Sequence, residues 1–542
     1  MEPEPQPEAD THQQSSAPRK QTSVSRSLGV VSGLTLISRI CGLARDVLLA
    51  RVFGDTAVAS AFAAALSVPN IFRRLFGEGA LSAAIVPEYA GLAEKDAHRA
   101  SAFAWSIVGL LVMATGVLWL IFETALALGL VLFDHSAERA IGIRLLLMTM
   151  PFMPLICVAA TTAGMLQVHG RFAPQAAQPI IMNCMMILAL AIGRAVLGLN
   201  ESGTAMWVAG AITLSGAVQV VWHFIELRKY APRRWALADA NKNVRAALKR
   251  FVPAVIGLGV TQLNSLADVI IATWPIYVGA TIFGFAYPLD ESSNSVLFYA
   301  QRFYMLPLGL FGTALGTVLF PVLARSAENR EVFIAALRNG MMGSLFLALP
   351  ACAGIVLVAR DMTTALAYGS SQFSADGATR CAGILAMYST GIWAFALQQV
   401  VIRSFYSLKD TVTPVRIAAY AVLLNFGLNV TLMWFMHEQG LAFATVIASI
   451  VQLLILCVLL HRRMDGKLFE SHDIGRVHTM LFPLLGLIAC VLLVQQLIPG
   501  SGSLSVILLR LFAATIAGGA AYLGLCIATR NPGMLWLIGK RS

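Results

Sequence analysis

The sequence predicts an all-α polytopic membrane protein with about 14 transmembrane helices. Hydrophobic residues fill 58% of its 542 positions, and charged residues fill only 12%. Long uncharged runs recur, and each can cross about 30 Å of hydrocarbon at ~20 residues a span. Two of them are SAFAWSIVGLLVMATGVLWLIF (101–122) and QGLAFATVIASIVQLLILCVLL (439–460). A soluble protein of this length does not need so much apolar sequence.

The predicted spans follow one another with short connections. Their approximate limits are 29–51, 57–79, 102–133, 140–167, 175–198, 204–227, 250–275, 295–323, 339–359, 378–402, 412–435, 439–460, 478–498 and 504–529. We expect two six-helix lobes, 28–228 and 249–461, and then two C-terminal helices with a basic cytoplasmic tail in 462–542. The first residues, 1–27, are polar and rich in Pro, Ser and Gln, which predicts a disordered cytoplasmic tail.

Similarity between two segments of the sequence supports the prediction of two lobes. Pro69 in VPNIFRRLFGEGALSAAIVP and Pro307 in LPLGLFGTALGTVLFP both precede FG, small residues and a closing proline. As many residues separate Arg171 from Lys409 as separate Pro69 from Pro307, and Arg171 and Lys409 both lie between predicted spans. Transporters built from repeats bind substrate between the repeats and rock one against the other.

Loop charges predict the orientation, because cytoplasmic loops are enriched in Lys and Arg. With a cytoplasmic amino terminus, the basic segment 229–248 becomes a cytoplasmic loop, whereas the outer loops 277–293 and 437–440 contain no Lys or Arg. Both termini are therefore predicted to be cytoplasmic. The net charge of +11 is accounted for by such loops and does not indicate a nucleic-acid partner.

The first span is unusual because it carries Arg39, Arg45, Asp46 and Arg51. An arginine at the centre of a spanning helix costs roughly 2.5–3.5 kcal/mol on insertion scales. On a helix, Arg39 and Asp46 share one face, and Ser38 and Arg45 share the neighbouring face. Arg51 is close to the outer end, where an arginine can extend to the lipid head groups.

Further charges follow in the second and eighth spans. Arg73, Arg74 and Glu78 lie in the second span, where Arg74 and Glu78 are spaced to pair on one helix face, and Arg302 lies in the eighth. Intramembrane ionisable groups usually line a cavity or pathway, although structural pairing and contact with lipid head groups also account for some. Positive charge exceeds negative charge here, and arginine suits phosphate. The pattern favours an anionic ligand such as a pyrophosphate.

Several motifs together resemble the MurJ (MviN) lipid II flippase family, within the multidrug/oligosaccharidyl-lipid/polysaccharide exporter superfamily. They are SRICGLARDVLLARVFG (38–54), PNIFRRLFGEGALSAAIVPEYA (69–90), GMLQVHGRFAPQAAQP (164–179), YAQRFYMLPLGLFGTALGTVLFP (299–321) and RSFYSLKDTVTPV (403–415). The resemblance implies fourteen helices around a cationic cavity in the bacterial cytoplasmic membrane. It also implies transport of lipid II, the undecaprenyl-pyrophosphate-linked peptidoglycan precursor, from the inner to the outer leaflet.

The resemblance also assigns roles to residues. Substrate-binding residues would be Arg39, Arg45, Arg73, Arg302, Ser38 and Asn70, and gating or charge partners would be Asp46, Arg74 and Glu78. Ser60 and Gln301 stand where the family often has acids, which leaves any proton coupling in question. Asp268 and Asn264 are one helical turn apart in the seventh span and resemble a sodium site of some members; a structural hydrogen bond explains them equally well.

Other functions remain open at this stage. A flippase for another polyprenyl-linked glycan would need the same pyrophosphate-binding arginines, whereas a cation-coupled multidrug exporter would need a more acidic cavity. An enzyme is not expected, since no carboxylate or metal constellation appears near the membrane surface. ATP is not expected to drive transport directly, because the chain has no GxxxxGK[ST] motif. No cofactor is expected, and the energy would come from Na+, H+ or the membrane potential. Expected partners are lipid II, membrane lipids and the cell-wall synthesis machinery.

Overall fold

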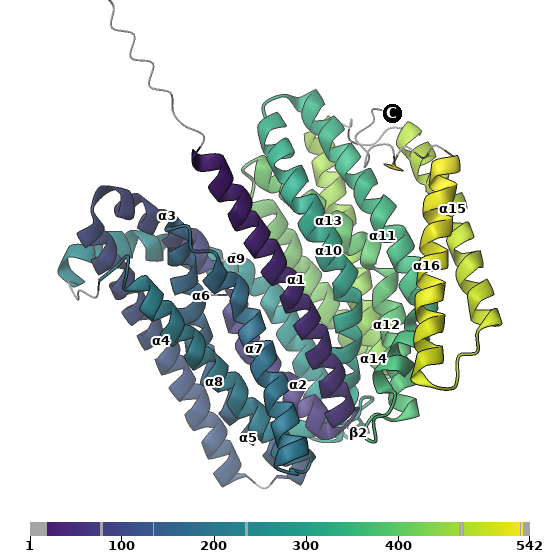
Figure 1. Ribbon diagram of the computed structural model, residues 1–542, viewed down its shortest axis with the longest axis horizontal. Helices are drawn as coiled ribbons and strands as arrows, with labels where there is room; N and C mark the ends of the chain where they lie inside the picture. Colours follow the sequence, from purple (N-terminus) through teal and green to yellow (C-terminus); the bar gives the residue numbers. More distant parts are fainter. Residues whose placement is uncertain are drawn as a thin grey trace, which may run out of the picture.

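The computed structural model describes residues 19–75, 80–133, 135–232, 237–465, 468, 471–529, 531 and 533–534, and these are almost entirely helical (Figure 1). The first part of the chain forms α1 (Arg19–Phe53), α2 (Ala57–Arg73), α3 (Ala80–Lys95), α4 (Ala97–Leu132), α5 (Ala137–Thr149), α6 (Phe152–Val168), α7 (Ala173–Ala191), the π-helical η2 (Ile192–Val196) and α8 (Glu201–Leu227). The second part forms α9 (Leu237–Tyr277), the two-stranded hairpin β1 (Thr281–Ile282) and β2 (Phe285–Ala286), α10 (Ser293–Ser326), α11 (Arg330–Ala367), α12 (Ala375–Thr390), α13 (Ile392–Ser407), α14 (Val412–Arg463), α15 (Ser471–Leu497) and α16 (Leu504–Ala528).

Short polar residues start many of these helices. A side-chain oxygen before the first turn accepts a hydrogen bond from a backbone N–H that the helix itself leaves unpaired. This capping occurs at Thr56, Asp96, Ser136, Asn200, Asn329 and Ser374. The sequence therefore fixes these helix starts locally, independently of the surrounding membrane.

The protein is a polytopic membrane protein. Eight helices among the described residues are long and apolar enough to cross a bilayer, and the bent pair α12 and α13 would make a ninth span. Large apolar side chains point outward, as at Ile121, Leu423 and Ile516, which are each 60% or more exposed. Such surfaces are favourable against lipid and unfavourable against water. α1, with its four charges between Arg39 and Arg51, is not among the eight.

The fourteen predicted segments fall on helices, but they do not correspond to helices one to one. Segments 412–435 and 439–460 both lie on α14, which breaks at His437 (φ 50°, ψ −133°). Segment 140–167 covers both α5 and α6, and the end of segment 57–79 lies outside the described residues. The count of fourteen crossings therefore stays a prediction.

Two expectations about non-helical segments need correction. α1 begins at Arg19, so residues 19–27 are helical, and only the earlier part of the expected tail lies outside the described residues. The expected basic loop 229–248 is helical from Leu237 onward. This part of α9 is amphipathic: Ala247 is buried, while Asn243 donates a hydrogen bond of 2.6 Å to Glu88. The prediction of a loop rested on the basic charges of this segment, whereas its apolar face favours a helix.

The helices are arranged in two groups, α1–α8 and α10–α14, with α9 packed against both. In Figure 1 the groups lie close together at the end that contains β2 and diverge toward the end where α1 begins. We call the first of these the distal end and the second the terminal end, since α1 starts and α16 finishes there. α15 and α16 form a hairpin that packs on α11, where Tyr522 donates a hydrogen bond of 3.0 Å to the Phe346 carbonyl.

Candidate functional site

Two adjoining pockets lie between the helix groups. The first, of about 190 Å³, is lined from α1 by Arg39 and Asp46 and from α10 by Arg302. The second, of about 210 Å³, is bounded by α1, α2, α9, α10 and α12, and it shares Arg302 with the first. Six residues predicted from the sequence to be functional line the second pocket or both: Arg45, Asn70, Arg73, Arg74, Asp268 and Arg302.

Arg45 is held firmly in the wall of the second pocket. Only 6% of the residue is exposed, and its Nη2 lies 2.7 Å from Asp46 Oδ1. Nη1 donates a hydrogen bond of 2.6 Å to Asn183 Oδ1 on α7, and Asn183 in turn donates to the Ser38 carbonyl at 3.3 Å. A buried guanidinium needs both charge compensation and hydrogen-bond acceptors. Asp46 and Asn183 supply them.

Arg39 reaches from α1 toward α10. A Cβ built on Gly309 of α10 would lie 3.1 Å from both terminal nitrogens of Arg39, so the guanidinium rests directly over this glycine. Arg39 and Asp46 lie on one face of α1 and both line the first pocket. The absence of a side chain at Gly309 is thus what makes room for the Arg39 charge between the two helix groups.

Local backbone chemistry in α2 positions Asn70 and Arg73. Pro69 lies inside α2 and has no N–H to donate to the Ala65 carbonyl four residues earlier. The hydroxyl of Thr149, at the end of α5, lies 3.0 Å from that carbonyl and also 3.0 Å from the Leu145 carbonyl, so the two carbonyls share this donor. Beyond the proline, Arg73 Nε donates to Asn70 Oδ1 at 3.2 Å. The helix therefore continues through the proline and presents both side chains to the second pocket.

Arg302 is the arginine shared by both pockets. Its guanidinium carbon lies 4.3 Å from the ring centroid of Phe298, one turn earlier on α10, which is a cation–π contact. Its Nε is buried and has no hydrogen-bond partner within the described part of the chain. A buried N–H donor without an acceptor is costly unless a ligand or water supplies one.

The charge of the two pockets is strongly unbalanced. Their walls contain five arginines (Arg39, Arg45, Arg73, Arg74 and Arg302) and only two carboxylates (Asp46 and Asp268) within the described residues. Cavities lined by one sign of charge concentrate ligands of the opposite sign. Arginine forks also match the oxygen geometry of phosphate groups. The arrangement is therefore suited to an anionic head group and unfavourable for an organic cation.

Within the described residues, Asp268 is hydrogen-bonded to Asn429 of α14 and not to Asn264. Asn429 Nδ2 donates hydrogen bonds to Asp268 Oδ1 at 2.6 Å and to Asn425 Oδ1 at 2.9 Å, and Asn425 donates to Thr445 Oγ1 at 3.2 Å. Asn429 Oδ1 is buried and has no partner among the described residues. Asn264 lines a separate pocket of about 120 Å³ that also contains Asn425 and Thr445.

The sequence analysis missed three polar residues of this cluster, which are Asn425, Asn429 and Thr445. A signal was present, because Asn425 and Asn429 are spaced i, i+4 in the otherwise apolar stretch LLNFGLNVTLMW. Two other predicted residues are not among those that line the pockets. Ser38 contributes its carbonyl to Asn183 but is not among the pocket-lining residues, and Glu78 lies outside the described residues.

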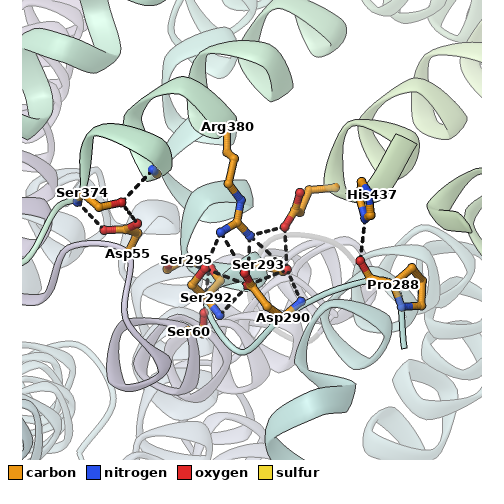
Figure 2. A network of polar contacts seen from close by, with 12 residues as sticks. Asp55, Ser60, Pro288, Asp290, Ser292, Ser293, Ser295, Ser374, Arg380 and His437 are labelled. Carbon is orange, nitrogen blue, oxygen red and sulfur yellow. Dashed lines mark hydrogen bonds and ion pairs between the residues drawn. The ribbon is translucent and has the colours of Figure 1, made fainter. Parts of the chain in front are cut away.

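A polar network closes the distal end between the two helix groups (Figure 2). Asp55, after α1, accepts hydrogen bonds from the Ser374 backbone nitrogen at 2.7 Å and from its hydroxyl at 2.6 Å. In α2, the Ser60 carbonyl accepts from Asn294 at 2.8 Å, and the Ser60 hydroxyl accepts from the Ser295 nitrogen at 2.9 Å. These contacts join α1 and α2 to the starts of α10 and α12.

The backbones approach closely at the same place. Gly54 has φ +58°, a conformation that favours glycine. A Cβ at Gly54 would lie 2.1 Å from the Gln372 carbonyl oxygen, which leaves no space for any side chain. Ser370 also donates its hydroxyl to the Arg51 carbonyl at 2.9 Å. Glycine is thus required at position 54 for both conformation and space.

A second part of the network holds the loop before α10. Arg380 Nη1 lies 2.9 Å from Asp290 Oδ2, and Arg380 Nη2 forms an ion pair with Glu438 (Figure 2). Ser293 donates to Glu438 at 2.7 Å. Burial acts to raise the pKa of the Asp290 carboxyl, but hydrogen bonds from Arg380 and Ser292 outweigh it, so the pKa lies below its usual value. Asp290 is therefore ionised and paired at neutral pH.

The two positions that lack the family's frequent acids are in different places. Ser60 lies in the distal network, where its hydroxyl accepts a hydrogen bond as a carboxylate would. Gln301 lines the second pocket and donates to the Tyr388 hydroxyl at 3.2 Å. Both side chains are neutral. The distal contact at Ser60 therefore does not depend on an ionised group, and the second pocket carries one negative charge fewer than it would with an acid at position 301.

Comparison with known proteins identifies close relatives. The family model described as "Lipid II flippase MurJ" matches residues 49–513. The chain is 33% identical over 463 residues to a probable lipid II flippase MurJ of Rhizobium tropici, covering 83% of each protein. It is 31% identical over 451 residues to the probable lipid II flippase MurJ of Vibrio cholerae, covering 80% of this chain and 82% of that protein.

Solved structures give the same picture. A lipid II flippase MurJ in an inward closed conformation superposes with a TM-score of 0.73 at 25% identity, covering 92% of this chain and 98% of that one. An inward-facing multidrug transporter of the MATE family matches with a TM-score of 0.63 at 14% identity, covering 81% and 98%. The second likeness concerns the fold alone.

Proposed function

Because this chain belongs to the MurJ family of lipid II flippases, we propose that it carries lipid II from the inner to the outer leaflet of the bacterial cytoplasmic membrane by alternating access. The family consists of membrane transporters, so the protein is a transporter and not an enzyme. In this proposal the pyrophosphate of the head group binds to Arg39, Arg45, Arg73 and Arg302, assisted by Asn70.

One observation carries the proposal: among the described residues, five arginines from α1, α2 and α10 line adjoining pockets that hold two carboxylates. Arg45 is already compensated by Asp46, whereas the buried Nε of Arg302 has no acceptor in the part of the chain that the structure describes. A pyrophosphate offers several acceptor oxygens at once, and charge-assisted hydrogen bonds to it are stronger than neutral ones. A head group bound here would satisfy Arg302 and neutralise the excess charge.

The distal network supports an inward-facing resting state, with both termini in the cytoplasm. Under this proposal the lobes 28–228 and 249–461 rock about the site, and the head group enters from the terminal end. Release on the other side requires the contacts between Asp55 and Ser374, and between Ser60 and Asn294, to break. Each is an ordinary hydrogen bond with a net contribution of about 0.5–3 kcal/mol. Such contacts are weak enough to reopen in every cycle.

Coupling to a cation fits the cluster around Asp268. Its ligands would be oxygens of Asp268, Asn425, Asn429 and Thr445, and the unpartnered Asn429 Oδ1 is available for one bond. Such oxygens suit a hard cation such as Na+. Asn264, which shares a pocket with Asn425 and Thr445, would belong to its surroundings. A bound cation would bring α9 and α14 together near the arginines. Flipping that is equal with and without sodium, and unchanged in Asp268→Ala, would remove this part of the proposal.

The decisive experiment measures lipid II exposure on the outer leaflet of cells depleted of their own flippase and supplied with this protein. Arg302→Ala and Arg39→Ala are compared with wild type at matched membrane abundance. The control is Arg99→Ala, because Arg99 is exposed and pairs only with Asp96 on its own turn. We expect wild type and the control to restore exposure, and both pocket variants to lose at least about tenfold, or roughly 1.4 kcal/mol.

The outcomes separate the alternatives. If a correctly inserted wild-type protein restores no lipid II exposure, then the cargo is another polyprenyl-linked glycan. If wild type works and the pocket variants work equally well, lipid II is the cargo but the arginines do not bind it.

A further inference from the structure

A fourth pocket, larger than the three described above, lies at the distal end and away from the central arginines. It has a volume of about 600 Å³ and is formed by the end of α11, the start of α12 and the α15–α16 hairpin. Its polar walls include Arg360, Thr364, Thr379, Ser501 and Arg510. None of these residues takes part in the flipping mechanism proposed above.

The described walls of the pocket carry more positive than negative charge, with two arginines, Arg360 and Arg510, and one carboxylate, Asp361. Arg510, on α16, is compensated, since its Nε lies 3.3 Å from Asp361 Oδ2 and both side chains are largely buried. That N–H does not point at the carboxylate, however, and it has no hydrogen-bond partner among the described residues. Arg360 is exposed at the pocket wall and forms no side-chain ion pair with any described residue.

Uncharged donors surround these two arginines. Thr364 and Thr379 line the pocket with hydroxyl groups, of which that of Thr379 donates to the Ala375 carbonyl at 2.9 Å. The start of α12 lies at the edge of the pocket, but its Ser374 already bonds to the Asp55 carboxylate. Together with the net positive charge of the arginines, the hydroxyl groups match the oxygens of a phosphate.

The surroundings of the pocket are apolar and face outward. Leu497, Leu509 and Phe512, on α15 and α16, are 72%, 60% and 59% exposed. Leu509 and Phe512 lie on the exposed side of α16, the helix that also supplies Arg510 to the pocket. A soluble phosphate would gain nothing from this surface, whereas a lipid would bury its chains against it.

We propose that this pocket binds the phosphodiester head group of an anionic membrane lipid, with Arg360 and Arg510 contacting the phosphate and the acyl chains lying along α16. The site is independent of lipid II flipping. It adjoins the distal network, because Ser374 lines the pocket and also bonds to Asp55. An occupied pocket therefore lies against a contact that must break when the distal end opens.

The test is a binding titration on the full chain in lipid-free detergent, followed by native mass spectrometry. The probes are dioleoylphosphatidylglycerol, dioleoylglycerol, which has the same chains but no phosphate, and inorganic phosphate. Arg360→Gln is the main variant, since this exposed side chain leaves no buried partner behind. Arg360→Lys keeps the charge. Arg194→Gln is the matched control, because Arg194 is also exposed and lies at the distal end but outside the pocket. It belongs to η2, close to Glu201, which accepts a hydrogen bond from Thr56.

We expect wild type to bind phosphatidylglycerol at least about tenfold more tightly than dioleoylglycerol, a difference of roughly 1.4 kcal/mol. Arg360→Gln should lose most of that preference, and Arg360→Lys and Arg194→Gln should keep it. The proposal is overturned if Arg360→Gln retains the preference while its unfolding midpoint equals that of wild type. It is also overturned, as a lipid site, if inorganic phosphate binds as tightly as phosphatidylglycerol.

Discussion

Asp55, in the turn after α1, accepts two hydrogen bonds from Ser374, the residue that caps α12. The two residues are far apart in the sequence, yet this contact ties the first helix to the second half of the protein. The same Ser374 hydroxyl accepts the Gly377 N–H at 2.8 Å, so one side chain both starts α12 and fastens it to α1. The contact links local helix capping to the closure of the whole distal end.

Replacing Asp55 by Ala should loosen the distal end. The Ser374 N–H loses its acceptor, which costs about 1–3 kcal/mol for a buried donor and less where water can replace the carboxylate. Hydrogen exchange at the amides that begin α12 should therefore speed up, as measured by mass spectrometry on the purified protein. Asp376→Ala is the control, because it removes an acid from the first turn of the same helix. Equal exchange in the two variants would show that Asp55 does not hold this end.

Gly309→Ala should disturb Arg39 without removing any charge. The new methyl group would lie 3.1 Å from the Arg39 guanidinium nitrogens, closer than ordinary packing, so the side chain must move. We expect lipid II flipping to fall about three- to tenfold, or roughly 1 kcal/mol. Gly354→Ala in α11 serves as control, since nothing lies within 4 Å of a Cβ there. Full activity of Gly309→Ala would mean that flipping does not depend on the position of the Arg39 guanidinium over Gly309.

Thr149→Val should destabilise α2 at its proline. Valine keeps the shape of threonine but leaves the Ala65 carbonyl without the donor that Pro69 cannot supply. The expected cost is about 1–3 kcal/mol, seen as a lower apparent unfolding midpoint at a fixed scan rate. The comparison is Thr161→Val, whose hydroxyl bonds only to the Cys157 carbonyl within its own helix. A drop no larger than in Thr161→Val would contradict the role given to Thr149.

The Asp290 ion pair should make one part of stability depend on pH. Its pKa in the folded protein is lowered, because the hydrogen bonds from Arg380 and Ser292 outweigh burial. The stabilisation is thus fully present above the unfolded value of about 3.9 and disappears as pH falls through the lower folded value. Asp290→Asn should therefore lower the unfolding midpoint at pH 7, and the difference from wild type should shrink progressively as the pH falls below about 3.9. A constant difference between the two proteins at all pH values would argue against this pairing.

The central site was partly predictable from the sequence. Helical spacing places Arg39 and Asp46 on one face, and arginines inside apolar spans usually line a cavity or pathway. Spacing could not show that Asn183 of α7 orients Arg45, or that Asp268 bonds to Asn429 of α14 and not to its neighbour Asn264. Those contacts join different helices, and the packing of helices is not encoded in the period of any one of them.

The sequence by itself determined the elements of this protein: its apolar spans, its capped helix starts and the concentration of arginine in the first, second and eighth spans. These follow from interactions within one helical turn and from the length of a membrane crossing. The tertiary structure decided which faces meet. It placed Arg302 beside both pockets, joined Asp55 to Ser374 and brought Arg360 near Arg510, because these contacts require helices distant in the chain to pack against each other.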